Sequence, residues 1–372
     1  MRPTLLEPRR AARVSGTGPI ERAIRMHNRD IIAIGTSAGG VEALRFLARG
    51  FPRDFPASVL GTIHLTRRFE SSLDSILSQA GPLPASFARD REALQKSRIY
   101  IAPPQRHLIV EPERLLLGNG PRDNSARPAI DPMFRSAALC CGLRSIGVVL
   151  TGSLGDGASG LFTLKQCGGI TVVQDPDEAG HPEMPLTALS RSKPDHVARL
   201  ADLPALLASL VRLPAGPPAK VPEATGYEVE IAKDGAQSKS AMNDFRDLDK
   251  IGRRSVLACP DCGGVMWECT EGDVVRYRCH VGHAYTAEVM SLALDENLRR
   301  ALASALRALD ERVALAQSLQ HQAIEKGRMM LAEIWGKRAQ EHLAEAEVIR
   351  GSLRRVDELA AAFARSKGSE AA

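Results

Sequence analysis

The sequence contains no apolar run that approaches the length of a membrane span, and its first thirty residues lack the hydrophobic core of a signal peptide. These absences argue against membrane insertion and secretion, and they predict a cytoplasmic location. Neither a G-x-G-x-x-G motif nor a lysine-bearing P-loop is present. Aromatic residues make up only 4% of the chain, and no basic run with interleaved aromatics accompanies its clustered cysteines. We therefore expect no nucleic-acid partner.

Positive charge gathers at the N-terminus. The formal net charge is +5, and within residues 1–30 seven arginines outnumber three carboxylates. The remainder of the chain is close to electrically balanced. We expect residues 1–29 to form a disordered basic tail, either a solvated arm or a binding arm, and residues 365–372 to form a second disordered tail.

Short apolar runs alternate with helical patterns over residues 30–213. The runs rich in β-forming residues are 31–35, 58–64, 98–104, 146–152 and 170–175. The helical stretches lie near 40–49, 68–79, 131–142 and 157–167. This alternation predicts an α/β fold with a doubly wound, mostly parallel sheet that helices cover on both faces. The stretch 107–118, "HLIVEPERLLLG", breaks the alternation and predicts an antiparallel hairpin near an edge of that sheet.

Three further segments follow this domain. Residues 214–254 begin with "PAGPPAKVPEATG", lack apolar periodicity and are expected to be a linker. Residues 255–287 carry paired cysteines and form a candidate zinc ribbon. Residues 288–364 have an apolar stripe at helical spacing, which predicts one long helix or a helical hairpin interrupted at Gly327 or Gly336. The stripe is typical of a packing seam or of helix-mediated self-association.

Ser37 follows the first predicted strand, within "IIAIGTSAGG". The glycines around it fit G-x-S-x-G, in which a tight strand-to-helix turn exposes a nucleophile, but a glycine-rich turn of this kind also cradles phosphates. His64 ends the second strand and Asp156 follows a later one. Either could have a purely structural role. All three at strand ends of one parallel sheet predict a Ser37–His64–Asp156 triad, in which the imidazole activates the hydroxyl and the carboxylate orients the imidazole.

The cysteines near residue 260 have the spacing of a metal site. Cys259 and Cys262 form a C-x₂-C pair, and sixteen residues separate them from Cys279. With His283 these residues make a tetrahedral ligand set typical of zinc, and His280 is the alternative fourth ligand. Because protein would fill all four positions, we expect a structural zinc ion and no cofactor for catalysis.

Residues 30–212 resemble the catalytic domain of the chemotaxis protein-glutamate methylesterases, the CheB family. The matching stretches are "IGTSAGGVEAL", "IHL", "IYIAPPQRHLIV", "RPAIDPMFRSAA", "GVVLTGSLGDGASGL" and "VVQDPDEAGHPEMP". The resemblance implies that Ser37 is the nucleophile, His64 the general base and acid, and Asp156 the orienting carboxylate. It also implies hydrolysis of glutamate methyl esters on chemoreceptors, with release of methanol. Some members deamidate receptor glutamines.

The sequence departs from the family in two places. Where G-M-G-x-D-G is usual, this chain has Ser153 and Leu154 in place of the methionine and the second glycine. The altered loop motivates an alternative, a non-catalytic regulator that binds a signalling partner. About thirty residues precede the first strand, too few for the phosphorylatable receiver domain common in the family, so we expect no such switch within this chain. Cysteine-rich C-terminal segments similar to this one accompany some receiver-less members.

Overall fold

The computed structural model describes residues 28–64, 72–216, 219, 221–234, 248–249, 251–271 and 274–369. Most of the expected N-terminal tail and of the stretch 235–247 therefore lies outside the described residues. Within the described part of the chain, no helix combines the length and the apolar character that a membrane span requires.

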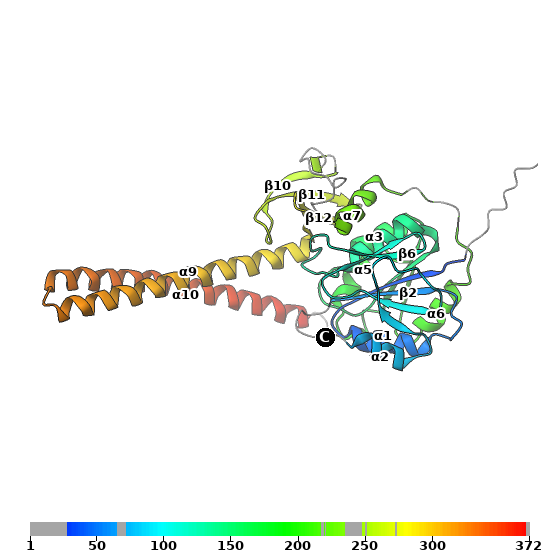
Figure 1. The fold of residues 1–372 in the computed structure, drawn as a ribbon, viewed down its shortest axis with the longest axis horizontal. Coiled ribbons are helices and arrows are strands. Elements are labelled where there is room, and N and C mark those ends of the chain that lie inside the picture. The colour runs from blue at the N-terminus through cyan, green and yellow to red at the C-terminus, as the bar shows by residue number, and fades with distance from the viewer. Residues whose placement is uncertain are drawn as a thin grey trace, which may run out of the picture.

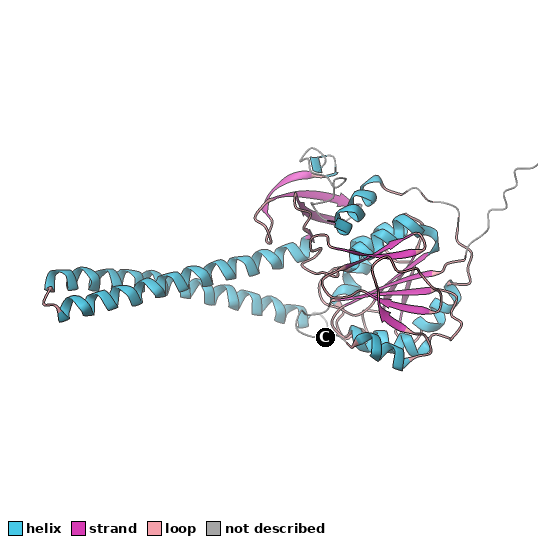
Figure 2. Ribbon diagram, in the orientation of Figure 1, coloured by secondary structure: helices cyan, strands magenta, loops and turns pink. Residues whose placement is uncertain are grey.

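A seven-stranded parallel sheet forms the core of the first domain (Figure 2). Its strand order is β3-β4-β2-β1-β7-β8-β9, and every neighbouring pair is parallel. The strands are β1 (Ile31–Thr36), β2 (Ser58–Ile63), β3 (Ala85–Phe87), β4 (Arg98–Ile101), β7 (Ser145–Val149), β8 (Ile170–Gln174) and β9 (His196–Ala198). The predicted doubly wound sheet is confirmed, and the sequence analysis missed only the two short edge strands β3 and β9.

Helices cover both faces of this sheet because each central strand is apolar on both sides. Side chains of β1 alternate between two buried clusters, with Ile32 and Ile34 in one and Ile31 and Ala33 in the other. The first cluster is closed by α1 (Gly40–Gly50), α2 (Leu73–Ala80) and α6 (Leu203–Leu210). The second is closed by α3 (Ile130–Cys141), which a 3-10 turn follows at Gly142–Arg144, and by α4 (Ala158–Gln166) and α5 (Glu183–Ser192).

The predicted hairpin is present but does not join the main sheet. Strands β5 (His107–Glu111) and β6 (Arg114–Gly118) pair only with each other as a two-stranded antiparallel sheet. Leu108 and Leu115 pack into the second cluster, beside α3. The hairpin therefore packs on a helix layer. Hydrogen bonds from Leu94 to Glu113 and from Leu115 to Glu92 also hold it to the segment between β3 and β4, which places it near one edge of the sheet.

Part of the expected linker is a helix. Helix α7 spans Glu223–Asp234, and its Val229 and Ala232 pack against Ile109 of β5. Its last carbonyl groups accept hydrogen bonds from the N–H groups of Asn119 (2.7 Å) and Gly120 (3.1 Å). The helix is thus held by tertiary contacts, which is why its weak apolar periodicity did not reveal it.

The C-terminal half contains a small sheet and a long hairpin (Figure 1). The antiparallel sheet consists of β10 (Arg253–Ala258), β11 (Val265–Glu271), β12 (Val274–Cys279) and β13 (Ala284–Thr286), and we call it the ribbon. Helices α9 (Ala287–Glu325) and α10 (Met329–Ser369) then project from the body of the molecule and return toward it. Gly327, at φ 70°, lies at the reversal, which confirms the hairpin alternative. Helix α10 continues to Ser369, into the stretch expected to be a disordered tail.

The apolar stripe is used within the chain. The seam between the two helices consists of alanines and a valine at three- and seven-residue steps, namely Val313, Ala316 and Ala323 on α9 and Ala332, Ala339 and Ala346 on α10. Small side chains at this spacing let two antiparallel helices approach closely. An ion pair between Arg299 and Asp357 (2.8 Å) sets the register near the base of the hairpin. Self-association through these helices stays a prediction.

Buried ion pairs hold the ribbon against the first domain. Glu228 of α7 accepts hydrogen bonds from Arg278 of β12, one of them at 3.0 Å from Nε, and lies 3.4 Å from Arg276. Asp123 lies 3.0 Å from Arg135 of α3 and 3.4 Å from Arg276. These five side chains, which we call the docking network, are at most 7% exposed. Removal of one partner would leave a buried charge uncompensated.

Glycine permits the close approach at this interface. Gly282 has φ 104°, and a Cβ built there would lie 2.7 Å from side-chain carbons of both Ile231 and Pro121. Any larger residue would therefore force the ribbon away from α7 and from the segment that leads into α3.

We predict that Glu228→Gln lowers the free energy of unfolding by about 3 kcal/mol, because it leaves Arg278 without its buried counter-charge and leaves Arg276 with Asp123 alone. Urea denaturation at pH 7 measures the change. Glu230→Gln on the same helix is the control, since its partly exposed carboxylate forms an i,i+3 ion pair with Lys233 and should matter by less than about 1 kcal/mol. Equal losses in the two variants would contradict this account of docking.

We also predict that the stability difference between wild type and Glu228→Gln depends on pH. Burial alone would raise the pKa of Glu228, but Arg276, Arg278 and Arg135 outweigh burial and lower the pKa to about 2. A depressed folded-state pKa contributes stability above the unfolded-state value, about 4.3, and loses it as the pH falls toward the folded-state value. The stability difference between wild type and Glu228→Gln should therefore be full at pH 6 and shrink steadily from pH 4.5 to pH 2.

Candidate active site and metal centre

Ser37 is the first residue after β1, in a turn that glycines make possible. Its N–H donates to the carbonyl of Thr151 at 3.1 Å, and its own carbonyl accepts from the N–H of Gly40 at 3.0 Å. Gly39 has φ 74° and precedes α1. A Cβ built at Gly40 would lie 2.5 Å from the hydroxyl of Thr36. The turn is thus tied to the end of β7 on one side and to the start of α1 on the other.

His64 lies beside Ser37 on the neighbouring strand. Strands β1 and β2 pair in parallel, with Thr36 opposite Ile63, so the next residue of each strand is Ser37 and His64 respectively. Backbones of paired strands lie about 4.8 Å apart. The His64 side chain is 22% exposed, and its Nε2 lies 2.7 Å from Oδ2 of Asp156.

Asp156 is 1% exposed and is surrounded by hydrogen-bond donors. Its Oδ2 accepts from the N–H of Ile130 at 2.6 Å, and its Oδ1 accepts from Nδ2 of Asn124 and from the N–H of Gly157, both at 2.9 Å. Burial would raise the pKa of Asp156, but the bond to His64 and these donors lower it below its usual value. An ionised carboxylate only accepts, so Nε2 of His64 carries the proton and Nδ1 is the basic nitrogen.

The structure therefore brings His64 and Asp156 into contact and leaves Ser37 at the adjoining strand end. This arrangement favours the triad over the phosphate loop as an interpretation of the turn. The catalytic roles of Ser37, His64 and Asp156 stay predictions.

The altered loop after β7 packs directly on the serine. A Cβ built at Gly152 would lie 2.9 Å from Cβ of Ser37. Leu154 has φ 68°, and its N–H donates to Oε2 of Glu183 at 3.0 Å, so that group is not available to a substrate. No backbone hydrogen bond joins the N–H group of Ala38 or that of Ser153 to another described residue. Ala38 follows Ser37, and Ser153 belongs to the loop that packs on it, so these two N–H groups are candidate donors for an oxyanion.

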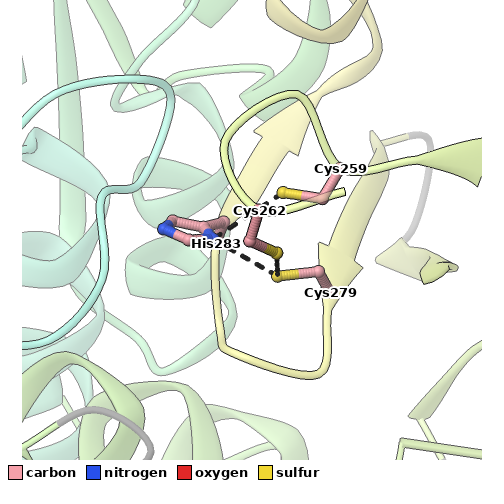
Figure 3. Close-up of side chains that lie close together, drawn as sticks. All are labelled: Cys259, Cys262, Cys279 and His283. Atoms are coloured by element: carbon pink, nitrogen blue, oxygen red, sulfur yellow. Dashed lines mark hydrogen bonds between the residues drawn. The ribbon is translucent and has the colours of Figure 1, made fainter. Parts of the chain in front are cut away.

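The predicted metal ligands meet in the ribbon (Figure 3). The ligand atoms of Cys259, Cys262, Cys279 and His283 all lie within 4.8 Å of one another. Sγ of Cys262 and Sγ of Cys279 are 3.7 Å apart, and Nδ1 of His283 lies 3.4 Å from Sγ of Cys279. Around a tetrahedral zinc ion with bonds of about 2.3 Å, sulfur ligands are separated by about 3.8 Å. The donor set and its spacing fit a zinc ion.

Two tight turns present these ligands. In the first, the N–H of Cys259 donates to the carbonyl of Gly264 at 2.8 Å, and in the second the N–H of Cys279 donates to the carbonyl of His283 at 2.9 Å. Nε2 of His283 faces Oδ2 of Asp261 at 3.9 Å, the carboxylate contact that commonly orients a ligating imidazole. The exposed His280, the alternative ligand, lies outside the cluster.

The three neighbouring thiols do not lose their protons equally easily, because a thiolate at one cysteine disfavours a second negative charge beside it. The hydrogen bond from Cys279 and the contact with His283 lower the pKa of Cys259 to about 3. The pKa of Cys279 is raised by its bond to Cys259 and by burial, and burial raises that of Cys262. A divalent cation stabilises the second and third thiolates, so the cluster has the chemistry of a metal site.

Sequence reasoning missed the residues that support Asp156. Asn124 and Asp131 occur in "RDNSARPAID", which has no helical or strand periodicity. Sequence reasoning also missed Glu183, which opens α5 and accepts from Leu154 in the loop beside Ser37. Cys140 and Cys141 are joined by a disulfide at the end of α3. No pattern in the sequence distinguishes these pairings.

Comparison with known proteins places the first domain. Residues 32–207 match the CheB methylesterase family. The chain is 36% identical over 183 residues to "Protein-glutamate methylesterase/protein-glutamine glutaminase 2" of Anaeromyxobacter dehalogenans, a match that covers 49% of this chain and 54% of that protein. It is 33% identical over 184 residues to "Putative protein-glutamate methylesterase/protein-glutamine glutaminase" of Leptospira interrogans, which covers 49% of this chain and 95% of that protein.

One solved structure, the Thermotoga maritima CheB methylesterase catalytic domain, is 29% identical with a TM-score of 0.47, over 49% of this chain and 98% of the other. The chain thus spans about half the length of the Anaeromyxobacter relative and nearly all of the Leptospira one. Since the match to the Leptospira relative combines 33% identity with almost complete coverage of that protein, the chain belongs to the CheB methylesterase family.

Proposed function

We propose that this protein hydrolyses methyl esters of glutamate side chains on a chemoreceptor-like signalling protein. The observation that carries the proposal is the 2.7 Å contact between His64 and the buried Asp156, next to the turn that holds Ser37. The names of the relatives, protein-glutamate methylesterase and protein-glutamine glutaminase, support the same reaction class.

In the proposed mechanism, Ser37 attacks the ester carbonyl while Nδ1 of His64 takes the hydroxyl proton. Asp156 stabilises the resulting imidazolium through Nε2. The N–H groups of Ala38 and Ser153 stabilise the tetrahedral oxyanion, for which each donor contributes about 3 kcal/mol. His64 then protonates the departing methoxide, and methanol leaves.

The acyl-enzyme is resolved by water. His64 removes a proton from the water as it attacks the Ser37 ester, and the second tetrahedral intermediate releases the glutamate carboxylate and the free serine. A glutamine side chain would pass through the same acyl-enzyme with ammonia as the leaving group. Deamidation is therefore a second reaction of the same site.

We assign the cysteine cluster to a structural zinc ion. Cys259, Cys262, Cys279 and His283 would fill all four tetrahedral positions, so no position is open for substrate. The ribbon buries few apolar side chains, and zinc binding supplies about 10 kcal/mol or more of folding free energy in small domains of this kind.

A non-catalytic regulator is the second candidate. It is favoured by the loop in which Leu154 replaces a family glycine and donates its N–H to Glu183. In that case the domain would bind a signalling partner without turnover. Covalent labelling of Ser37 by a fluorophosphonate separates the two candidates, because labelling requires an activated hydroxyl.

We predict that Ser37→Ala abolishes methanol release from a methylated receptor fragment and abolishes fluorophosphonate labelling, because the attacking oxygen is removed. The melting temperature should change little. Ser209→Ala on α6 is the matched control and should retain full turnover. Methanol release by Ser37→Ala at the wild-type rate would exclude the proposed mechanism.

Asp156→Asn should lower kcat about 10⁴-fold, because a neutral amide in this place favours the wrong tautomer of His64. Steady-state methanol release measures the effect. A decrease below tenfold would mean that the His64–Asp156 contact is structural only.

We expect one zinc ion per chain by elemental analysis of the purified protein. Cys279→Ser should remove the metal and lower the melting temperature, since it deletes one of four ligands. Cys269→Ser, on the neighbouring strand but outside the cluster, should keep the zinc. Metal-free wild-type protein with an unchanged melting temperature would refute the site.

A further inference from the structure

Asn124 lies between the ribbon and the predicted triad. It is 4% exposed and follows β6 in the segment that leads into α3. Its Nδ2 donates to Oδ1 of Asp156 at 2.9 Å and to Oδ2 of Asp131 at 3.1 Å. Its Oδ1 accepts from the N–H of Thr286 at 2.9 Å, and its own N–H donates to the carbonyl of Ala284 at 2.8 Å. The amide is thus engaged on both sides.

The backbone at Asn124 needs these bonds. Its φ is 51° and that of Ser125 is 63°, so two consecutive residues adopt the left-handed region. Non-glycine residues rarely adopt this conformation, although asparagine tolerates it best. Surrounding contacts must therefore hold the segment, and the bonds from Ala284 and Thr286 of β13 are among them.

Resting on the proposed function, we propose that Asn124 is a positioning residue for Asp156 and that the ribbon holds Asn124 in place. The ribbon does so through two backbone groups of β13, which is followed at once by α9. The C-terminal unit is then part of the support of the triad, and its attachment controls turnover.

Charge explains why an amide occupies this position. Asp131 and Asp156 are both buried, and the single NH₂ group of Asn124 donates to both carboxylates. Burial raises the pKa of Asp131 to about 7, so a further carboxylate here would meet two acidic groups in a site that already disfavours charge. Without the amide, Oδ1 of Asp156 loses its one side-chain donor among the described residues and keeps the N–H groups of Gly157 and Asp131, so the carboxylate is held less firmly against the imidazole.

The contact between the ribbon and Asn124 can be tested by removing a single hydrogen-bond donor, the N–H of Thr286. Its φ of −68° and ψ of 162° suit proline, which lacks the N–H that Asn124 accepts. The threonine hydroxyl also accepts from the N–H of Val289 at the start of α9 (3.4 Å). Thr286→Pro and Thr286→Ala both lose this hydroxyl, but only proline removes the bond to Asn124. The alanine variant is therefore the matched control.

Two measurements on the full-length protein test the inference. The first is solvent exchange of the His64 Nε2 proton, followed by NMR of ¹⁵N-histidine-labelled protein, which reports the contact with Asp156 without any turnover. The second is the split of methanol release into kcat and KM. We expect Thr286→Pro to exchange this proton about tenfold faster than Thr286→Ala and to have an about tenfold lower kcat, with KM within threefold.

Asn124 variants give a second, independent arm. Asn124→Ala should lower kcat about 100-fold, and Asn124→Asp, although it has the same shape, should be lower still, because it places a third carboxylate beside Asp131 and Asp156. If Thr286→Pro does not fold, the inference is tested by the order of kcat in wild type, Asn124→Ala and Asn124→Asp, together with the rate of His64 Nε2 proton exchange in Asn124→Ala.

Equal proton exchange and equal kcat in Thr286→Pro and Thr286→Ala overturn the inference, as does wild-type kcat in Asn124→Ala. If wild-type protein releases no methanol, yet the proline variant accelerates proton exchange, the proposed function fails and the positioning role of Asn124 stands. The two failures are therefore distinguishable.

Discussion

The structure depends on keeping one buried carboxylate ionised. Asp156 is almost wholly removed from solvent, where an isolated charge is strongly disfavoured. It stays charged because His64, Asn124 and the first N–H groups of α3 all point at it. Donors at a helix N-terminus are well suited to a negative charge. The position of α3, and hence of the helix layer on that face of the sheet, is set by this requirement as much as by apolar packing.

The same principle joins the two halves of the chain. In the docking network, Asp123 and Arg135 belong to the first domain, Glu228 to α7, and Arg276 and Arg278 to the ribbon. Buried ion pairs contribute modestly to net stability but are costly to separate, so they specify one arrangement of the parts. The ribbon is therefore held in one position against the first domain by the docking network.

Features with local or periodic signals could be predicted from sequence. The apolar runs that lead to Ser37 and His64 predict a parallel sheet. The carboxyl ends of the strands in such a sheet lie at the same edge. The C-x₂-C spacing predicts that Cys259 and Cys262 lie together with Cys279 and His283. Helix α7 and Asn124 had no such signal, because contacts between residues distant in the chain stabilise them. The predicted domain of residues 30–213, followed by "PAGPPAK", gives no indication that residues 223–234 fold back onto it.

In the proposed mechanism, the ribbon bears on the chemistry through its place in the chain and not through the metal ion that its cysteines would hold. Its last ligand, His283, is three residues before Thr286, whose N–H meets Asn124. Thr286 also caps α9, so the metal cluster, the root of the long hairpin and the support of Asp156 share one short segment. A displacement of the hairpin at its base would move this segment before it moved the sheet. If the triad works as proposed, turnover would then respond to whatever holds the hairpin.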